Sequence, residues 1–483
     1  MSSLLDHFEP QPLWRHFAAL AAIPRASGKE AAIRAYVLAQ AARLRLDASQ
    51  DSAGNVVVRK PARPGRESAP PTVLQGHLDM VCEKNEGTPH NFDTDPIQLI
   101  PEGDWLHAAG TTLGADNGAG VAAALAVMES GSIAHGPLEF LFTIDEETGL
   151  TGAAQFPAAL LHAHYFLNLD NEEEGTLCIG CAGGINTTAR RPLALLPAPA
   201  SGSTWRIKVS GLQGGHSGID IHKGRGNAIR ILGRLLQILL AQLPASVAAI
   251  QGGSKRNAIP REASAVVVLA SAREPELRAL LATVEADLRA ELGSFDPALR
   301  LSLESALAPA QVLTPADAQL AAGVMASLHH GVLAMSPDIP GLVQTSTNLA
   351  TVSTDAGIFE IGTSQRSPIE SGKLAAARMV STVLSFARFE VEHTGGYPGW
   401  KPEPASDLVR LAQSVHQQVL GAPARLIAMH AGLECGVIGE KYPGMQTISF
   451  GPHIVDAHSP TERLKISSIA PFWAFLCALL EQL

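Results

Sequence analysis

The sequence predicts an α/β protein with a discontinuous first domain, built on a mixed sheet flanked by helices, and an inserted α+β domain. Three observations support this. At 483 residues the chain is too long for one ordinary domain. Strand-like runs alternate with helical periodicity up to residue 170, and a Pro-rich stretch, RRPLALLPAPASG, interrupts that pattern. The α/β pattern returns near residue 405, so we expect boundaries at 1–186, 187–397 and 398–483.

The first part shows a β-α-β alternation. Its expected helices lie at 11–22, 28–46, 117–131 and 152–162, and its expected strands at 55–60, 72–79, 138–144 and 164–170. Ser27 is expected to cap the second helix, because its hydroxyl can accept from a free N–H of the first turn. The alternation favours a sheet that is at least partly parallel.

The inserted part has two similar halves. The first half is expected as strand 203–210, helix 224–243, strands 246–251 and 263–271, helix 274–292 and strand 299–305. The second half is expected as helix 315–334, strands 343–353 and 356–363, helix 370–388 and strand 388–394. One interpretation is a duplicated β-α-β-β-α-β unit forming one extended sheet. The C-terminal part is then expected as helix 405–420, strands 425–429 and 445–451, and helix 467–482.

Composition excludes several functional classes. The formal charge is −10, and no basic run is present that would neutralise phosphates, so we expect no nucleic-acid partner. No secretory signal or long apolar segment is present, which predicts a cytoplasmic protein without a membrane partner. The five cysteines do not form a disulfide framework. Cys178 and Cys181 form a C-x-x-C pair, which we interpret as part of a packed turn rather than a zinc or redox site.

Polar residues follow the ends of several predicted strands. They are His77, Asp79, Asp116, Glu146, Glu147, Asp170 and, near the C-terminus, His458. His77 and Asp79 are two apart, so on a strand they face the same side, and Asp79 can orient the imidazole. Glu146 and Glu147 are adjacent and would diverge on an extended backbone, one binding metal while the other acts as a base.

This ligand set suits a metal centre. Two imidazoles and several carboxylates without cysteine favour Zn²⁺, Co²⁺ or Mn²⁺. The set is rich enough in carboxylates to hold two ions with one bridging aspartate. Two ions about 3.5–4 Å apart activate a water and polarise a carbonyl or phosphoryl oxygen. Hydrolysis is therefore the predicted chemistry.

Five motifs carry a family resemblance. GHLDMV, LGADNG, DEETGLTG, NLDNEE and AHSPTE resemble, in order and spacing, the co-catalytic zinc peptidases of the M20 family, in its aminoacyl-histidine dipeptidase branch. The resemblance also covers the insertion, with GLQGGHSGIDIHKGRGNAI and KRNAIP. It implies a catalytic domain, an inserted lid, and hydrolysis of dipeptides that include β-alanyl-histidine.

The resemblance implies roles for single residues. His77 and Asp170 would hold one zinc, Glu147 and His458 the other, and Asp116 would bridge them. Glu146 would be the general base and Asp79 would orient His77. On the lid, His216 would reach the tetrahedral oxyanion once the domains close. Substrate would be held by Asn257, Arg366 and His430, which lie in KRNAIP, QRSPIE and MHAGLE.

Simpler interpretations of the same residues stay open. Asp116 could cap a helix, and Asp170 could be a turn residue. His216 could be a loop histidine and His430 a polar strand end. Arg366 could pair with a surface acid, although its planar fork also suits a substrate carboxylate.

Other functions also stay open. A tripeptide or acylamino-acid hydrolase would share the metal site and differ in its pocket. A non-catalytic metal-binding scaffold is a third option, although such a protein could have lost Glu146, which is present. The sequence leaves open whether the chain forms a homodimer, which metal it carries and which N-terminal residue it prefers.

Overall fold

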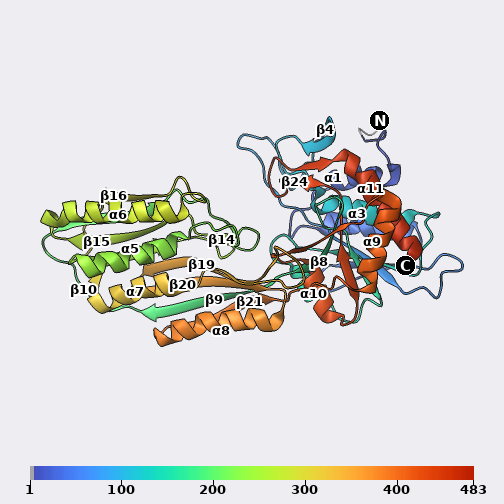
Figure 1. Ribbon diagram of the computed structural model, residues 1–483. Helices are drawn as coiled ribbons and strands as arrows, with labels where there is room; N and C mark the ends of the chain where they lie inside the picture. Colours follow the sequence, from blue (N-terminus) through green and yellow to red (C-terminus); the bar gives the residue numbers. More distant parts are fainter. Residues whose placement is uncertain (1–4) are drawn as a thin grey trace. The chain divides into compact units, whose positions relative to one another are not determined.

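The computed structural model describes residues 5–483, and the chain forms two compact units (Figure 1). Unit 1 contains Met1–Cys181, Trp400–Ala428 and Leu433–Leu483, and unit 2 contains Ala182–Gly399 and Met429–Gly432. The last segment was expected with the C-terminal part of the first domain. It groups with unit 2 because the Ala182 N–H donates to the carbonyls of both Met429 and Ala431, at 3.0 Å each.

Unit 1 is built on an eight-stranded mixed sheet with the order β1-β2-β6-β3-β7-β23-β8-β22. The strands are β1 (Asp47–Gln50), β2 (Val56–Lys60), β3 (Thr72–His77), β6 (Leu138–Thr143), β7 (Tyr165–Asn168), β8 (Thr176–Cys181), β22 (Arg425–Met429) and β23 (Gln446–Ser449). The four central strands, β6-β3-β7-β23, are parallel to one another. Their carboxyl ends therefore meet at one edge of the sheet, where open α/β sheets place their sites.

Helices pack on both faces of this sheet. They are α1 (Gln11–Ala21), α2 (Ala31–Arg43), α3 (Ala115–Glu129), α4 (Thr151–Gln155), α9 (Asp407–Leu420), α10 (Glu434–Lys441) and α11 (Ile466–Gln482). Helix α3 packs on β3 and α1, and α9 packs on α11 and β23. On the opposite face, Val57, Val73, Leu141 and Phe166 pack with α4 and α10. A small sheet, β24-β25-β5-β4, completes the unit with β4 (Leu99–Glu102), β5 (Trp105–Ala108), β24 (Ile454–Val455) and β25 (Arg463–Lys465).

Unit 2 is built on an antiparallel sheet with the path β16-β11-β15-β13-β19-β20-β9-β21, with β18 paired to β19. The strands are β9 (Gly183–Pro192), β11 (Ser203–Ser210), β13 (Ser246–Gly252), β15 (Ala263–Leu269), β16 (Arg300–Ser305), β18 (Gly331–Met335), β19 (Val343–Asp355), β20 (Ile358–Ser367) and β21 (Glu390–Tyr397). Two short pairs accompany it: β10 (Leu195–Pro197) with β17 (Gln311–Leu313), and β12 (Gly215–His216) with β14 (Ala258–Ile259).

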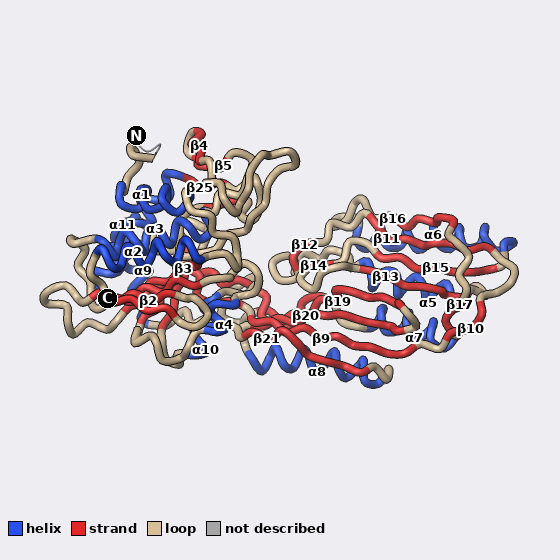
Figure 2. The backbone as a smooth tube through the Cα atoms, turned by 180° about the vertical axis from the view of Figure 1, so that it is seen from behind, coloured by secondary structure: helices blue, strands red, loops and turns tan. Residues whose placement is uncertain are grey.

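Four long helices cover one face of the unit 2 sheet, and Figure 2 shows the strands from the other side. They are α5 (Ala228–Gln242), α6 (Glu274–Leu292), α7 (Pro315–Ser327) and α8 (Glu370–Phe386), and a short 3₁₀ turn, Ser271–Arg273, precedes α6. The apolar faces of these helices and of the strands form one continuous core. The predicted α/β class, with an inserted α+β domain, is confirmed.

Several local expectations were wrong. Glu30, not Ser27, precedes α2, and the Ser27 hydroxyl donates instead to Asp79 at 2.7 Å. The helix expected at 315–334 ends at Ser327, because the chain then forms β18. Cys178 and Cys181 lie in strand β8 rather than in a turn, and both side chains are buried. Within residues 5–483, no helix is both long enough and apolar enough to cross a membrane.

Candidate functional site

The residues at the carboxyl ends of the parallel strands converge in unit 1. His77 is the last residue of β3, and Glu146 and Glu147 lie in the loop after β6. Asp170 follows β7, and His458 lies in the loop between β24 and β25. Asp116 lies in the first turn of α3, where Gly114 holds the cap position. The Asp116 side chain does not cap the helix; it contacts both imidazoles.

Asp116 joins two groups of metal-ligand atoms. One carboxylate oxygen, Oδ1, lies 3.0 Å from His77 Nε2, and Oδ2 lies 2.9 Å from His458 Nε2. Asp170 Oδ1 lies 3.4 Å from the same nitrogen of His77, and Glu147 Oε2 lies 3.0 Å from His458 Nε2. The two triads, His77–Asp116–Asp170 and Asp116–Glu147–His458, each bring their ligand atoms within 4.8 Å of one another. The shared member is Asp116.

Asp79 organises the loop after β6. It is fully buried, and its Oδ1 lies 3.4 Å from His77 Nδ1. Its two oxygens also accept the backbone N–H groups of Glu146, at 3.1 Å, and Glu147, at 3.2 Å. One carboxylate thus orients an imidazole and fixes the position of both glutamates.

Glu146 and Glu147 do not diverge as an extended backbone would require. Asp145 takes a left-handed conformation with φ 50°, and a turn begins at Glu147. Both carboxylates therefore offer an oxygen within 4.8 Å of a His77 nitrogen. His458 is also left-handed, with φ 64°, a conformation that non-glycine residues rarely adopt outside constrained sites.

The charges of this cluster favour bound cations. Burial opposes protonation of His77, yet Asp170, Asp116 and Asp79 together raise its pKa well above the usual value. Hydrogen bonds to Asp116 and Glu147 raise the pKa of His458 to about 11. Glu147 Oε1 and Asp170 Oδ1 are buried without a hydrogen-bond partner among the described residues.

Buried carboxylate oxygens are costly without a counter-charge. The cluster brings four carboxylates, from Asp116, Glu146, Glu147 and Asp170, around two imidazoles. Divalent cations bound by these side chains would supply the counter-charge that the buried carboxylates need.

Two residues that the sequence reasoning missed hold the Asp116 loop. Glu462 is buried, and its carboxylate accepts four backbone N–H groups, from Leu113 at 2.8 Å, Gly114 at 2.9 Å, Ala115 at 2.7 Å and Asp116 at 3.3 Å. Its position in the AHSPTE motif was an available signal.

Arg25 is the second of these residues, and it contacts both the end of β3 and the loop before α3. This buried guanidinium donates to the carbonyls of Leu78 at 3.0 Å, Asp79 at 2.7 Å, and Gly114. It therefore ties the end of β3 to the loop before α3. No local motif marks Arg25.

A buried glutamate lies beneath the site. Glu434 accepts hydrogen bonds from Gln75 at 2.5 Å and Thr143 at 2.7 Å, in the strands that carry His77 and Glu146. Burial raises the pKa of Glu434 to about 8. The sequence reasoning singled out the MHAGLE motif for His430 and passed over this residue.

The four residues expected to hold substrate all lie in unit 2. His216 Nδ1 accepts the backbone N–H groups of Gly218 and Ile219, at 3.2 Å each. Burial and the neighbouring Arg366 lower the pKa of His216 to about 4, so the ring is neutral at pH 7. Because Nδ1 is an acceptor, the proton is on Nε2, which makes His216 a hydrogen-bond donor.

Arg366 is buried and has no carboxylate partner among the described residues. Its Nη1 donates to the Tyr397 hydroxyl oxygen at 2.8 Å, and its Nε lies 3.4 Å from Ser217 Oγ. The Tyr397 ring is packed between two glycines, since a Cβ at Gly184 or Gly432 would lie 2.6 or 2.8 Å from it. The alternative interpretation, in which Arg366 pairs with a surface acid, therefore has no such acid among the described residues.

His430 and Asn257 complete the predicted set. His430 Nε2 lies 2.7 Å from Ser346 Oγ, and burial, with Arg366 nearby, lowers its pKa to about 3. Asn257 is exposed, next to the β12–β14 pair, and its carbonyl accepts the Ser217 N–H at 2.8 Å. His430 is thus close to His216 and Arg366, while Asn257 borders the strand that carries His216.

Comparisons with known proteins identify the family of this chain. The family model described as Peptidase family M20/M25/M40 matches residues 73–482. The cytosol non-specific dipeptidase of Escherichia coli K12 is 38% identical over 481 residues, covering 100% of this chain and 99% of that protein. A crystal structure of aminoacylhistidine dipeptidase from Vibrio alginolyticus has a TM-score of 0.91 and 40% identity, over 100% of this chain and 98% of that one.

A more distant structure shares the fold. Aminopeptidase PepT from Bacillus cereus has a TM-score of 0.57 at 16% identity, over 98% of this chain and 99% of that one. The motifs, the two-unit fold and the paired triads around Asp116 agree with the family match, which spans most of the sequence. The chain belongs to peptidase family M20/M25/M40.

Proposed function

We propose that this protein is a dinuclear-zinc dipeptidase that hydrolyses free dipeptides, Xaa-His dipeptides among them. The observation that carries the proposal is the pair of ligand triads sharing Asp116 at the carboxyl ends of parallel strands. Family membership and the names of the two relatives at 38% and 40% identity support a dipeptide substrate.

The proposed ligands divide into two sets. His77 and Asp170 would hold one zinc, Glu147 and His458 would hold the other, and Asp116, which belongs to both triads, would contribute to each set. Imidazole and carboxylate donors suit zinc, and they accept Co²⁺ or Mn²⁺ as substitutes. Such ions, when bound, polarise a carbonyl oxygen and lower the pKa of a water.

The protein's own residues then move the proton. Glu146 is close to His77, and it is not needed in either triad around Asp116. It takes the proton from the attacking water and delivers it to the leaving amine. Asp79 keeps this geometry, because it accepts the Glu146 N–H and faces His77 Nδ1.

Unit 2 supplies the groups that recognise the substrate. His216 presents an Nε2–H donor to the substrate oxygen that becomes negative in the transition state. Arg366 binds the free carboxylate of the dipeptide, which supplies the counter-charge that the guanidinium lacks. Asn257 and His430 contact the rest of the substrate. We also propose a cytoplasmic location and a homodimer, the latter to be checked by light scattering.

A dipeptide panel tests the proposal. Purified protein is stripped with a chelator, reloaded with Zn²⁺, Co²⁺ or Mn²⁺, and assayed for amino-acid release from Xaa-His and other dipeptides, N-acyl amino acids and tripeptides. We expect release from dipeptides only after metal is restored. Full activity in the stripped protein would contradict the metal assignment. Preference for N-acyl amino acids or tripeptides would contradict the substrate class.

A further inference from the structure

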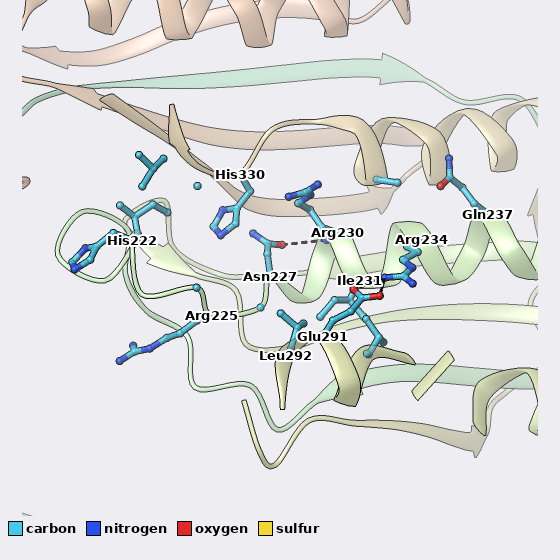
Figure 3. A pocket seen from close by; sticks show the side chains of 17 residues that line it. His222, Arg225, Asn227, Arg230, Ile231, Arg234, Gln237, Glu291, Leu292 and His330 are labelled. Atoms are coloured by element: carbon cyan, nitrogen blue, oxygen red, sulfur yellow. Dashed lines mark hydrogen bonds and ion pairs between the residues drawn. The ribbon is translucent and has the colours of Figure 1, made fainter. Parts of the chain in front are cut away.

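Unit 2 contains a cavity of about 640 Å³ in which none of the proposed catalytic or dipeptide-binding residues takes part (Figure 3). Its walls come from the loop 221–227, from α5, from the end of α6, and from the end of α7 with the segment that leads into β18. Arg230, Arg234 and Gln237 line it from successive turns of α5, because a spacing of three or four residues places side chains on one helix face.

Two of the three arginines in the wall contact acceptors of the protein itself. Arg234 binds both oxygens of Glu291, at 2.8 and 2.7 Å. Arg225 lies 3.6 Å from Asp220 and also donates to the Gly214 carbonyl at 2.5 Å. Both guanidiniums therefore have acceptors within the protein, although Arg225 shares Asp220 with Lys223, which lies 2.7 Å from that carboxylate.

Arg230 differs from both. Among residues 5–483, no carboxylate forms an ion pair with it, and no acceptor receives a hydrogen bond from its guanidinium. Its Nε is buried without a partner. Arg230 is therefore the arginine of this wall whose guanidinium has no partner among the described residues, in a protein whose net charge is −10. A partly buried guanidinium without an acceptor is a costly arrangement that an anion would relieve.

The rest of the wall sets the character of a ligand. Burial, with Arg230 and His329 nearby, lowers the pKa of His330 to about 3, so this imidazole is neutral. The Asn348 side chain lies beside this imidazole, although His330 Nδ1 and Asn348 Oδ1 are both buried without a well-aligned hydrogen bond among the described residues. Ile231, Leu292 and Val332 line the remaining wall with apolar surface. Figure 3 shows the His330 and Arg230 side chains near each other, which agrees with the effect of the Arg230 charge on His330.

We propose that this cavity binds a small organic anion with an apolar body. The Arg230 guanidinium would pair with the charged group of the ligand, and the His330 imidazole would form a hydrogen bond with it. The charged group is a carboxylate or a phosphate, since either satisfies the planar fork of arginine. The apolar part of the ligand packs against Ile231, Leu292 and Val332.

Isothermal titration calorimetry on the metal-loaded full chain tests this inference. The probes are 4-methylpentanoate, 3-methylbutyl phosphate and the uncharged 4-methylpentanamide. The variants are Arg230→Gln, Arg230→Lys and the matched control Arg206→Gln, whose exposed side chain in β11 does not line the cavity. Binding at the metal site is common to all variants, so only the component that depends on Arg230 is counted.

We expect at least one anion to bind wild type on the order of tenfold more tightly than Arg230→Gln, with Arg230→Lys between them and Arg206→Gln close to wild type. The amide should show no component that depends on Arg230. Stronger binding of either anion also identifies the charged group. Equal affinities in wild type and Arg230→Gln, or an amide bound as tightly as the carboxylate, would overturn the proposal. If Arg230→Gln fails to fold, as judged by circular dichroism, the comparison of wild type with Arg230→Lys decides.

Discussion

Glu462 should be essential for the metal centre without touching a metal. Its carboxylate accepts four backbone N–H groups from the segment that ends in Asp116, and hydrogen bonds to a charged group contribute about 1.5–3 kcal/mol each. In Glu462→Gln one oxygen becomes an NH₂ group, so about two of the four bonds are lost. The free energy of unfolding of unit 1 should fall by about 3–6 kcal/mol.

Urea denaturation of the metal-free protein measures this change, with zinc content after dialysis as a second measurement. Tryptophan fluorescence reports mainly on unit 1, which holds four of the five tryptophans: Trp14, Trp105, Trp400 and Trp473. Glu102→Gln is the control, because that side chain is 82% exposed. A Glu462→Gln protein that unfolds at the wild-type urea concentration and retains its zinc would refute the reasoning.

Three further predictions concern the reaction. Glu146→Gln should keep its metal and lose activity by roughly 10²–10⁴-fold; loss of metal instead would mean that Glu146 and Glu147 exchange roles. His216→Ala should lower kcat on the order of 10²–10³-fold with metal content intact, because its Nε2–H acts mainly in the transition state, and an unchanged kcat would exclude this role. Tyr397→Phe removes the hydroxyl that positions Arg366, so KM for free dipeptides should rise while amidated dipeptides are unaffected; equal changes for both would point to general misfolding.

The position of the metal-ligand candidates could be predicted because it follows from strand direction. His77, Glu147 and Asp170 follow strands that turned out to be parallel neighbours, so their side chains reach one edge of the sheet. The geometry of Glu146 could not be predicted in the same way. The prediction that adjacent side chains point to opposite sides holds only for extended backbone. Asp145 is not extended, because its φ is 50°.

Contacts between segments far apart in the chain could not be predicted from the sequence. Ser27 has the local features of an N-cap, but its hydroxyl donates to Asp79, 52 residues away. Glu462 and Leu113 are 349 residues apart, and Arg25 and Gly114 are 89 apart. These partners are chosen by tertiary structure, which local preference does not encode. Residues that position the loops of a site, such as Glu462 and Arg25, are therefore harder to predict from sequence than the candidate metal ligands themselves.

The strand order of the two similar halves of unit 2 was also beyond what local sequence patterns could predict. The first half pairs its strands in the order β16-β11-β15-β13, and the second half continues as β19-β20-β9-β21. Each half is a β-α-β-β-α-β unit with its last strand beside its first, and the two join edge to edge through β13 and β19. The first strand of the second half is β9, which precedes the whole first half in the chain.

The complete first half is therefore inserted after the first strand of the second. The sequence prediction placed the domain boundary within β9. The predicted second half therefore lacked its first strand. That missing strand pairs with β20 along Gly183–Pro192, and the pairing sets Gly184 opposite Arg366. Gly184 also leaves room for the Tyr397 ring that contacts Arg366. The strand that sequence order concealed is thus the one that positions the proposed carboxylate-binding arginine.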